Sequence, residues 1–177
     1  RVKVNILLPA KITMLRNNEL LEETEVKAFE RNSTTQNTAA AVTVLSKYAL
    51  QRLGTQSLLA AVNTVPGVKM DERSPGSYRL SIRGNLLRST FGVRNVKVYW
   101  NGIPFTDANG NTYLNQLSLN NISRMEIIKG PSGSMYGSGT GGVVLLSSGS
   151  TPTSKQQFAE VQAVAGSFGL FSGNVSY

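Results

Sequence analysis

A glycine-rich stretch at residues 137–142 has the spacing G-x-G-x-x-G, which in dinucleotide-binding proteins joins a strand to a helix. The residues that follow, 143–146, are all valine or leucine and have the composition of a buried strand rather than of a helix. No lysine follows the glycines, as a phosphate-binding P-loop requires, and the next acid is Glu160. The stretch therefore favours a tight structural loop, where the backbone passes close to another segment.

A second polar stretch, residues 107–111, begins like a calcium-binding loop, with an aspartate followed by asparagine and glycine. Such a loop requires glycine at its sixth position and a carboxylate at its twelfth. Those positions hold Thr112 and Ser118. The pattern favours a polar surface loop, with a weak adventitious ion site as the alternative.

One isolated acid, Glu126, lies between apolar residues in a segment with the alternation of a strand. A buried glutamate is usually paired with a cation rather than catalytic. Arg83 and Lys129, each followed by glycine, are the expected partners of this carboxylate. The sequence therefore predicts a structural ion pair in preference to an acid–base catalyst.

The composition excludes several classes of chemistry outright. The 177 residues include no histidine and no cysteine, which rules out disulfides, thiol nucleophiles, zinc fingers and a Ser-His-Asp triad within the chain. The apolar runs are only a few residues long, far short of the ~20 that a membrane-spanning helix needs. We expect no enzyme, no cofactor and no metal site.

The net charge of +8 indicates a negatively charged partner. Six basic residues and no acid fall between Arg73 and Phe105, which predicts a basic face. An acidic protein cavity and a nucleic acid are the two candidates for what this face meets, but the chain carries no RNA-binding signature. A soluble basic module that binds nucleic acid is the alternative function, and nucleic acid is not the expected partner.

Two short helices are predicted in the first half of the chain. Ser46 is suited to cap a helix over residues 47–53, which Gly54 would end. A second helix is predicted over residues 56–63, with leucine and valine on one face, before a Pro-Gly turn.

Strands account for most of the remaining pattern. They are predicted over residues 2–8, 41–45, 68–71, 79–83, 93–100, 124–128 and 143–146. Asn101 and Gly102 predict a tight hairpin turn, and residues 114–119 a short helical turn. Residues 30–38 are polar and have a linker composition, and residues 132–142 are expected to form a loop.

The last segment has a different pattern. Residues 157–165 and 171–177 alternate between an apolar and a more polar face, and a glycine-bearing turn joins them. This pattern matches a hairpin from a membrane β-barrel, although for this segment alone an ordinary amphipathic hairpin is the favoured interpretation. Because a lone hairpin is marginal in water, we expect further strands beyond this chain.

Four sequence blocks occur in a fixed order, over residues 80–84, 96–104, 122–132 and 135–145. Together they resemble the plug domain of TonB-dependent outer-membrane receptors, whose pattern runs approximately IRG, DG-(V/I)-P, IE-V-x-RGP-x-S-x-LYG and GGVINI. Asn101 stands where the family usually has aspartate, and Lys129 where arginine is usual.

The resemblance implies an α+β fold: a small mixed β-sheet plug domain with short helices, followed by the first β-hairpin of a transmembrane β-barrel. It also implies a domain organisation: the tail of an upstream β-domain at 1–9, the TonB-box region and linker at 10–38, the plug at 39–150 and the first barrel hairpin at 151–177. The family gates energised uptake of a scarce ligand such as a siderophore, vitamin or glycan. The plug lies inside the barrel in the outer membrane, with the N-terminus in the periplasm.

The partners that the resemblance implies are TonB, the receptor's own barrel and a transported ligand that the sequence does not identify. TonB would pair a strand with the extended segment Glu23, Thr24, Glu25, Val26, Lys27 and Ala28. Ion pairing between plug and barrel is expected at Arg83, Glu126 and Lys129. The outer loops would contact the ligand through Asn85, Arg88, Asp107, Asn109 and Asn111.

Overall fold

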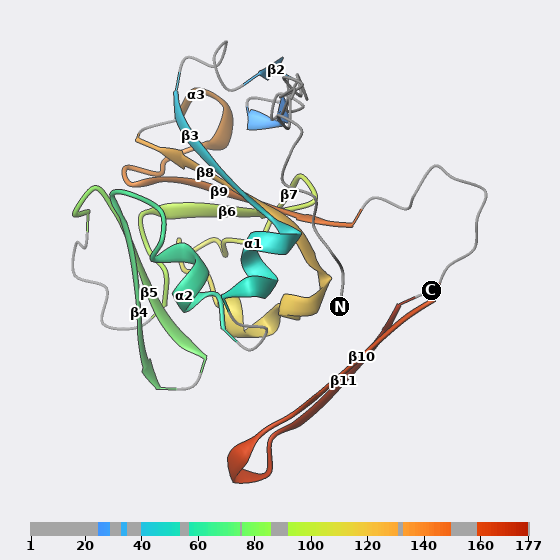
Figure 1. Cartoon of the computed structure of the whole chain (residues 1–177). Coiled ribbons are helices and arrows are strands. Elements are labelled where there is room, and N and C mark those ends of the chain that lie inside the picture. The colour runs from blue at the N-terminus through green and yellow to red at the C-terminus, as the bar shows by residue number, and fades with distance from the viewer. Residues whose placement is uncertain are drawn as a thin grey trace, which may run out of the picture.

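A mixed five-stranded sheet forms the centre of the molecule (Figure 1). The computed structural model describes residues 25–28, 33–34, 40–53, 57–74, 76–85, 92–130, 133–149 and 159–176. The sheet order is β3 (Ala41–Ser46), β8 (Ile122–Lys129), β9 (Gly142–Ser148), β6 (Val96–Trp100) and β7 (Ile103–Pro104). β6 and β9 run parallel, and the other neighbours are antiparallel.

Shorter elements surround this sheet. A separate antiparallel hairpin consists of β4 (Val68–Ser74) and β5 (Ser77–Ile82). The helices are α1 (Lys47–Arg52), α2 (Leu59–Val62), η3 (Leu114–Gln116), η4 (Leu119–Asn121) and α3 (Gly133–Tyr136). None of the helices in the described ranges is long and apolar enough to cross a membrane. At the N-terminal side, β1 (Glu25–Val26) pairs with β2 (Ser33–Thr34).

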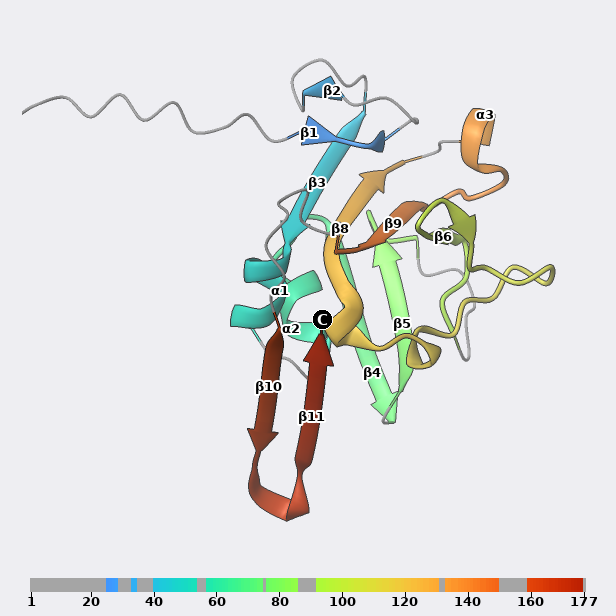
Figure 2. The same cartoon turned by 90° about the vertical axis from the view of Figure 1, so that its right-hand side faces the viewer.

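The sheet buries both of its faces, so the molecule has three layers. Because side chains alternate along a strand, β8 sends Ile127 to one face and Ile128 to the other. Ile127 joins the main core with α1, α2 and the β4–β5 hairpin. Ile128 joins a smaller cluster that includes Val26 and Tyr136. Figures 1 and 2 show α1 and α2 on one side of the sheet, with β1, β2 and α3 on the other.

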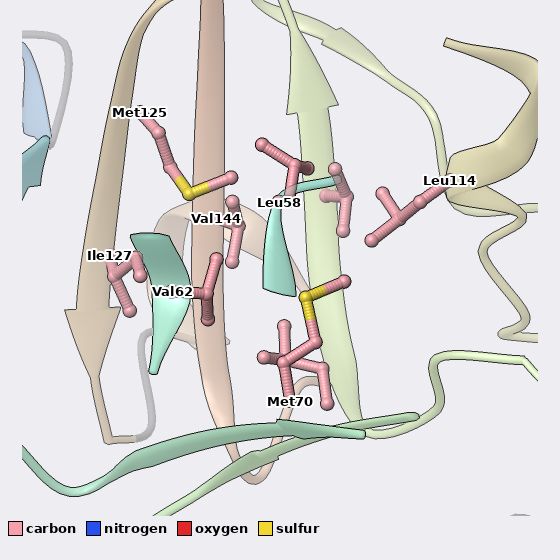
Figure 3. A pocket seen from close by; sticks show the side chains of 9 residues that line it. Leu58, Val62, Met70, Leu114, Met125, Ile127 and Val144 are labelled. Carbon is pink, nitrogen blue, oxygen red and sulfur yellow. The ribbon is translucent and has the colours of Figure 1, made fainter. Parts of the chain in front are cut away.

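The main core contains a small cavity (Figure 3). Its lining is entirely apolar and comes from α2 and its N-cap, three sheet strands, the β4–β5 hairpin and η3. The lining residues are Leu58, Val62, Met70, Leu80, Val98, Leu114, Met125, Ile127 and Val144. A ligand site needs convergent polar groups to fix orientation, so this cavity is a packing gap.

The predicted helices form with one adjustment. Ser46 caps α1, where its hydroxyl accepts a hydrogen bond from the Ala49 N–H at 3.4 Å. The second helix is shorter than predicted, because the Ser57 hydroxyl accepts the Leu59 N–H at 3.1 Å and sets the helix start there. Gly54, the predicted end of α1, lies outside the described residues.

Two other predictions are changed or fall outside the structure. Residues 132–142 are not all loop, because residues 133–136 form α3. The ring of Tyr136 in α3 packs edge-on to the ring of Tyr99, with 5.3 Å between the ring centroids. The predicted strand at residues 2–8 lies outside the described residues. A mixed sheet with short helices, the α+β arrangement predicted for the plug, is confirmed.

The predicted tight turn between β6 and β7 is also confirmed. Asn101 and Gly102 both have positive φ, at 49° and 82°, as a two-residue hairpin loop requires. The Asn101 amide also bridges to β9: its Nδ2 donates to Ser148 Oγ at 2.9 Å, and its Oδ1 accepts the Ser148 N–H at 2.9 Å. One side chain therefore fixes both the turn and the end of β9.

This geometry predicts a small cost for the family's usual residue at this position. In Asn101→Asp the carboxylate still accepts the Ser148 N–H, and the serine hydroxyl can rotate to donate to it. We expect a loss of less than about 1 kcal/mol in the free energy of unfolding, against roughly 2 kcal/mol or more for Asn101→Ala. Urea unfolding followed by the fluorescence of Trp100, the chain's only tryptophan, measures both. Equal losses for the two variants would contradict the bridging role.

The C-terminal hairpin has the predicted alternation. β10 (Glu160–Ala165) pairs with β11 (Phe171–Ser176) through a turn that contains η5 (Ser167–Gly169). The register places Val161 opposite Val175 and Ala165 opposite Phe171, and these pairs share one face. Val161, Val175 and Phe171 are more than 70% exposed. The hairpin therefore presents an apolar face with nothing packed on it in the described part of the chain.

Candidate functional site

A short N-terminal segment, residues 25–28, packs on the second face of the sheet, and we call it the docked segment. Val26 and Ala28 are 0% and 1% exposed, whereas Lys27 between them is exposed. Val26 ends the short strand β1 and Ala28 lies in a 3-10 turn, so two side chains that face the sheet flank one that faces solvent. The two buried side chains join the cluster of Ile128, Tyr136 and Val143. Figure 2 shows β1 and β2 beside the start of β3.

The Glu126 carboxylate holds the docked segment through its backbone. The Lys27 N–H donates to both carboxylate oxygens, each at 3.0 Å. Arg124 Nε donates to Oε1 of the same carboxylate at 2.7 Å. Glu126 is only 2% exposed, so these charge-assisted hydrogen bonds compensate an anion that is removed from water.

The cation that pairs with Glu126 is Arg124, and the prediction of Arg83 or Lys129 is wrong. Residues i and i+2 of a strand lie on the same face, so β8 brings Arg124 alongside Glu126 without any long-range contact. This spacing was the signal in the sequence that could have identified the partner. Burial of Glu126 on one face of a strand is confirmed.

Within the described ranges, few other contacts hold the docked segment. β1 and β2 pair at only two positions, Glu25 with Thr34 and Val26 with Ser33. Glu23 and Thr24, the first residues of the predicted TonB-binding segment, lie outside the described residues. The contacts shown are therefore a two-residue ladder, two small apolar side chains and one carboxylate.

Arg83 and Lys129 lie near each other at one end of the sheet. A Cβ on Gly130, the neighbour of Lys129, would lie 3.5 Å from Arg83 Nη1. Lys129 Nζ donates to the Pro66 carbonyl at 2.7 Å. Across the described ranges, neither cation has a carboxylate within ion-pair distance. This end of the sheet therefore carries two positive charges that no acid among the described residues neutralises.

The glycine-rich stretch is the tight structural loop that the sequence favours. A Cβ on Gly142 would lie 2.3 Å from the Ile128 carbonyl oxygen, and one on Gly141 would lie 3.0 Å from the Asn95 carbonyl oxygen. The strand β9 follows the glycines, so there is no helix N-terminus to receive a pyrophosphate. The glycines allow backbone to pack against backbone.

The loop at residues 107–111 is closed by its own hydrogen bonds. The Asp107 carboxylate accepts the Asn111 N–H at 2.7 Å, and the Asp107 N–H donates to the Asn111 carbonyl at 2.9 Å. Asp107 and Asn109 are exposed. No cluster of three metal-ligating side chains occurs among the residues that the structure covers. The predicted polar surface loop is what forms.

Hydrogen bonds near the starts of β6 and β9 involve two of the predicted ligand-contact residues, Asn85 and Asn111. Asn85 Nδ2 donates to Thr140 Oγ1 at 2.9 Å, beside the glycine-rich loop. Arg94 Nε donates to Asn111 Oδ1 at 2.6 Å. The carbonyl of Asn95, the next residue, accepts the Gly141 N–H at 2.8 Å. Arg88 lies outside the described residues.

A comparison with known proteins identifies the family. The family model described as the TonB-dependent receptor plug domain matches residues 34–144, more than half of the chain. The vitamin B12 transporter BtuB of Vibrio vulnificus (strain CMCP6) is 28% identical over an alignment of 144 positions, which covers 71% of this chain and 23% of that protein. The chain thus spans about a quarter of this curated relative.

Solved receptor structures share the fold. BauA, the ferric preacinetobactin receptor from Acinetobacter baumannii, superposes with a TM-score of 0.59 at 20% identity, covering 81% of this chain and 20% of that chain. Fiu, the ferric-catecholate import receptor from E. coli K12, gives a TM-score of 0.55 at 22% identity and covers 82% and 20%.

On these grounds the chain belongs to the TonB-dependent receptor plug domain family, which serves outer-membrane transport and is not an enzyme family.

Proposed function

We propose that this chain is the plug of a TonB-dependent outer-membrane transporter and gates energised uptake of a scarce ligand such as a siderophore, vitamin or glycan. The observation that carries the proposal is the docked segment: part of the predicted TonB-binding sequence is extended and lies on the plug sheet. Family membership supports it, as do relatives that carry vitamin B12 or ferric siderophores.

In this proposal TonB pairs a strand with residues 23–28 in the periplasm. Strand addition uses the backbone groups of an extended segment, so it needs little from the side chains. The docked segment is suited to this role because only two residues of β2 pair with it in the described structure.

The barrel would interact with the plug at its unneutralised cations. Arg83 and Lys129 would pair with carboxylates of the barrel wall, since the described plug residues supply none. Glu126 is removed from this proposed set, because Arg124 and the Lys27 N–H occupy its carboxylate.

The hairpin β10–β11 would be the first hairpin of that barrel. Its exposed apolar face, with Val161, Phe171 and Val175, would meet lipid, and its polar face the lumen. The ligand would contact the outer loops through Asn85, Asp107, Asn109 and Asn111, together with Arg88. The proposed domain organisation is the one predicted from the sequence: an upstream β-domain tail at 1–9, the TonB-box region and linker at 10–38, the plug at 39–150 and the first barrel hairpin at 151–177.

The test is binding to the purified periplasmic domain of TonB from the same organism. Deletion of residues 23–28 from the full-length receptor should weaken binding more than tenfold, and a free peptide of residues 21–30 should compete. A peptide with the same side chains but N-methylated at alternate backbone amides is the matched control and should not compete. Unchanged binding after the deletion would overturn the TonB-binding assignment.

A further inference from the structure

We propose that Glu126 is a retention site for the docked segment, which keeps residues 25–28 from pairing with TonB until the contact is broken. The carboxylate recognises the backbone N–H of Lys27, and the sheet recognises the small apolar side chains of Val26 and Ala28. This inference deepens the proposed function and rests on residues 25–28 being part of the TonB-binding segment.

The contact is specific because the carboxylate is fixed before the segment arrives. Arg124 lies on the same strand, and its Nε donates a hydrogen bond to Glu126 Oε1 at 2.7 Å. Val44 on β3 and Leu145 on β9 lie on either side of Glu126 in the sheet register. The carboxylate is thus in the interior of the sheet face, with its two oxygens directed at a single backbone N–H.

Release of the segment is feasible because it uncovers the charge. Glu126 is 2% exposed while the docked segment lies above it. Once Val26 and Ala28 lift from the sheet, water can reach the carboxylate and replace the lost hydrogen bonds. The anion is therefore never left both buried and without a partner, which is the expensive condition.

The docked and TonB-bound states exclude each other. A TonB strand along residues 25–28 needs backbone groups that β2 and Glu126 already occupy. If TonB binds only the released segment, its apparent dissociation constant equals the intrinsic constant divided by the released fraction. Retention by Glu126 therefore lowers the apparent affinity for TonB.

A thiol-protection assay measures the released fraction without TonB. The chain has no cysteine, so Ala28→Cys adds one small thiol at a position that is 1% exposed. Maleimide labelling is done on the full-length receptor in outer-membrane vesicles, with the rate of the unmodified receptor subtracted. In this background Glu126→Gln should raise the labelling rate about tenfold or more, because one oxygen becomes an NH₂ that faces the Lys27 N–H.

The matched control is Glu72→Gln. The Glu72 carboxylate also accepts a backbone N–H, from Gly76 at 3.0 Å, but in the exposed turn of the β4–β5 hairpin. The chemical change is the same, so this variant should leave the labelling rate within about twofold. An equal increase for both substitutions would overturn the retention site.

A second variant keeps the test decisive if Glu126→Gln does not fold. Lys27→Pro removes the donated N–H and leaves the whole plug sheet unchanged. It should also raise labelling about tenfold, whereas Lys27→Ala keeps the N–H and changes only an exposed side chain, with a much smaller effect. Labelling that stays slow in both Glu126→Gln and Lys27→Pro would overturn the proposal.

Measuring the affinity for TonB separates this inference from the proposed function. Glu126→Gln should bind the TonB periplasmic domain more tightly, by the same factor as its labelling increases. Faster labelling with unchanged TonB affinity would overturn the competition. Failure of every variant and of the unmodified receptor to bind TonB would instead overturn the proposed TonB-binding segment itself, and the competition with it.

Discussion

Gly142→Ala is expected to destabilise the chain by more than about 3 kcal/mol. The new Cβ would lie 2.3 Å from the Ile128 carbonyl oxygen and 3.1 Å from Ile82 Cδ1. The closest atom is backbone in the neighbouring strand β8, so it cannot rotate away, and β8 and β9 would have to separate. The φ of +143° adds strain, because side-chain-bearing residues rarely adopt it. Urea unfolding followed by Trp100 fluorescence measures the loss.

Gly137→Ala in the same loop separates the cost of the Cβ clash from the cost of backbone strain. Gly137 also has a positive φ, at 76°, but a Cβ there would meet nothing within 4 Å. This variant should cost about 1 kcal/mol, the strain of the left-handed conformation alone. If the two alanine variants unfold at the same urea concentration, close packing of Gly142 on β8 is not what the position requires.

Ile127→Ala is expected to cost about 3–5 kcal/mol in the free energy of unfolding. Ile127 is 0% exposed on a central strand and lines the core cavity with Val62 and Met70 (Figure 3). Truncation would enlarge that cavity, and the strands on either side of β8 keep the backbone from collapsing into it. The cost therefore combines lost transfer free energy with lost packing contacts.

Ile103→Ala provides a control of the same residue type. Ile103 is 67% exposed on the edge strand β7, and its truncation should change stability by less than about 0.5 kcal/mol. Ile127→Val should cost about 1 kcal/mol in the free energy of unfolding, between the losses for Ile103→Ala and Ile127→Ala. Similar losses at the buried and the exposed isoleucine would contradict the core placement of Ile127.

The Glu126 contact changes how the plug is connected to its N-terminal segment. The sequence predicts Glu126 as part of an ion-pair set with Arg83 and Lys129, facing the barrel. In the structure the carboxylate instead faces the docked segment, and the two cations stand apart with Lys129 bound to a backbone carbonyl. The acid and the cations therefore have separate proposed partners: the N-terminal segment for the acid and the barrel for the cations.

Local features were predictable because they depend on neighbours in the chain. The strands, the Ser46 cap and the positive-φ turn at Asn101 and Gly102 follow from side-chain periodicity and from backbone preferences of single residues. The extent of α2 was not predicted, because a hydroxyl at Ser57 competes with helical bonding at its start.

The sequence by itself determined the sheet strands, the buried position of Glu126 and, through four ordered blocks, the family. Only the tertiary structure decided what Glu126 and Gly142 contact. Lys27 and Glu126 are 99 positions apart, and they meet because β8 lies in the interior of the sheet with one face open to the docked segment. Gly142 meets the Ile128 carbonyl because β8 and β9 are neighbours in a particular register. Periodicity gives the face on which a side chain lies, but strand order and register give its partner, and these depend on the packing of the whole sheet.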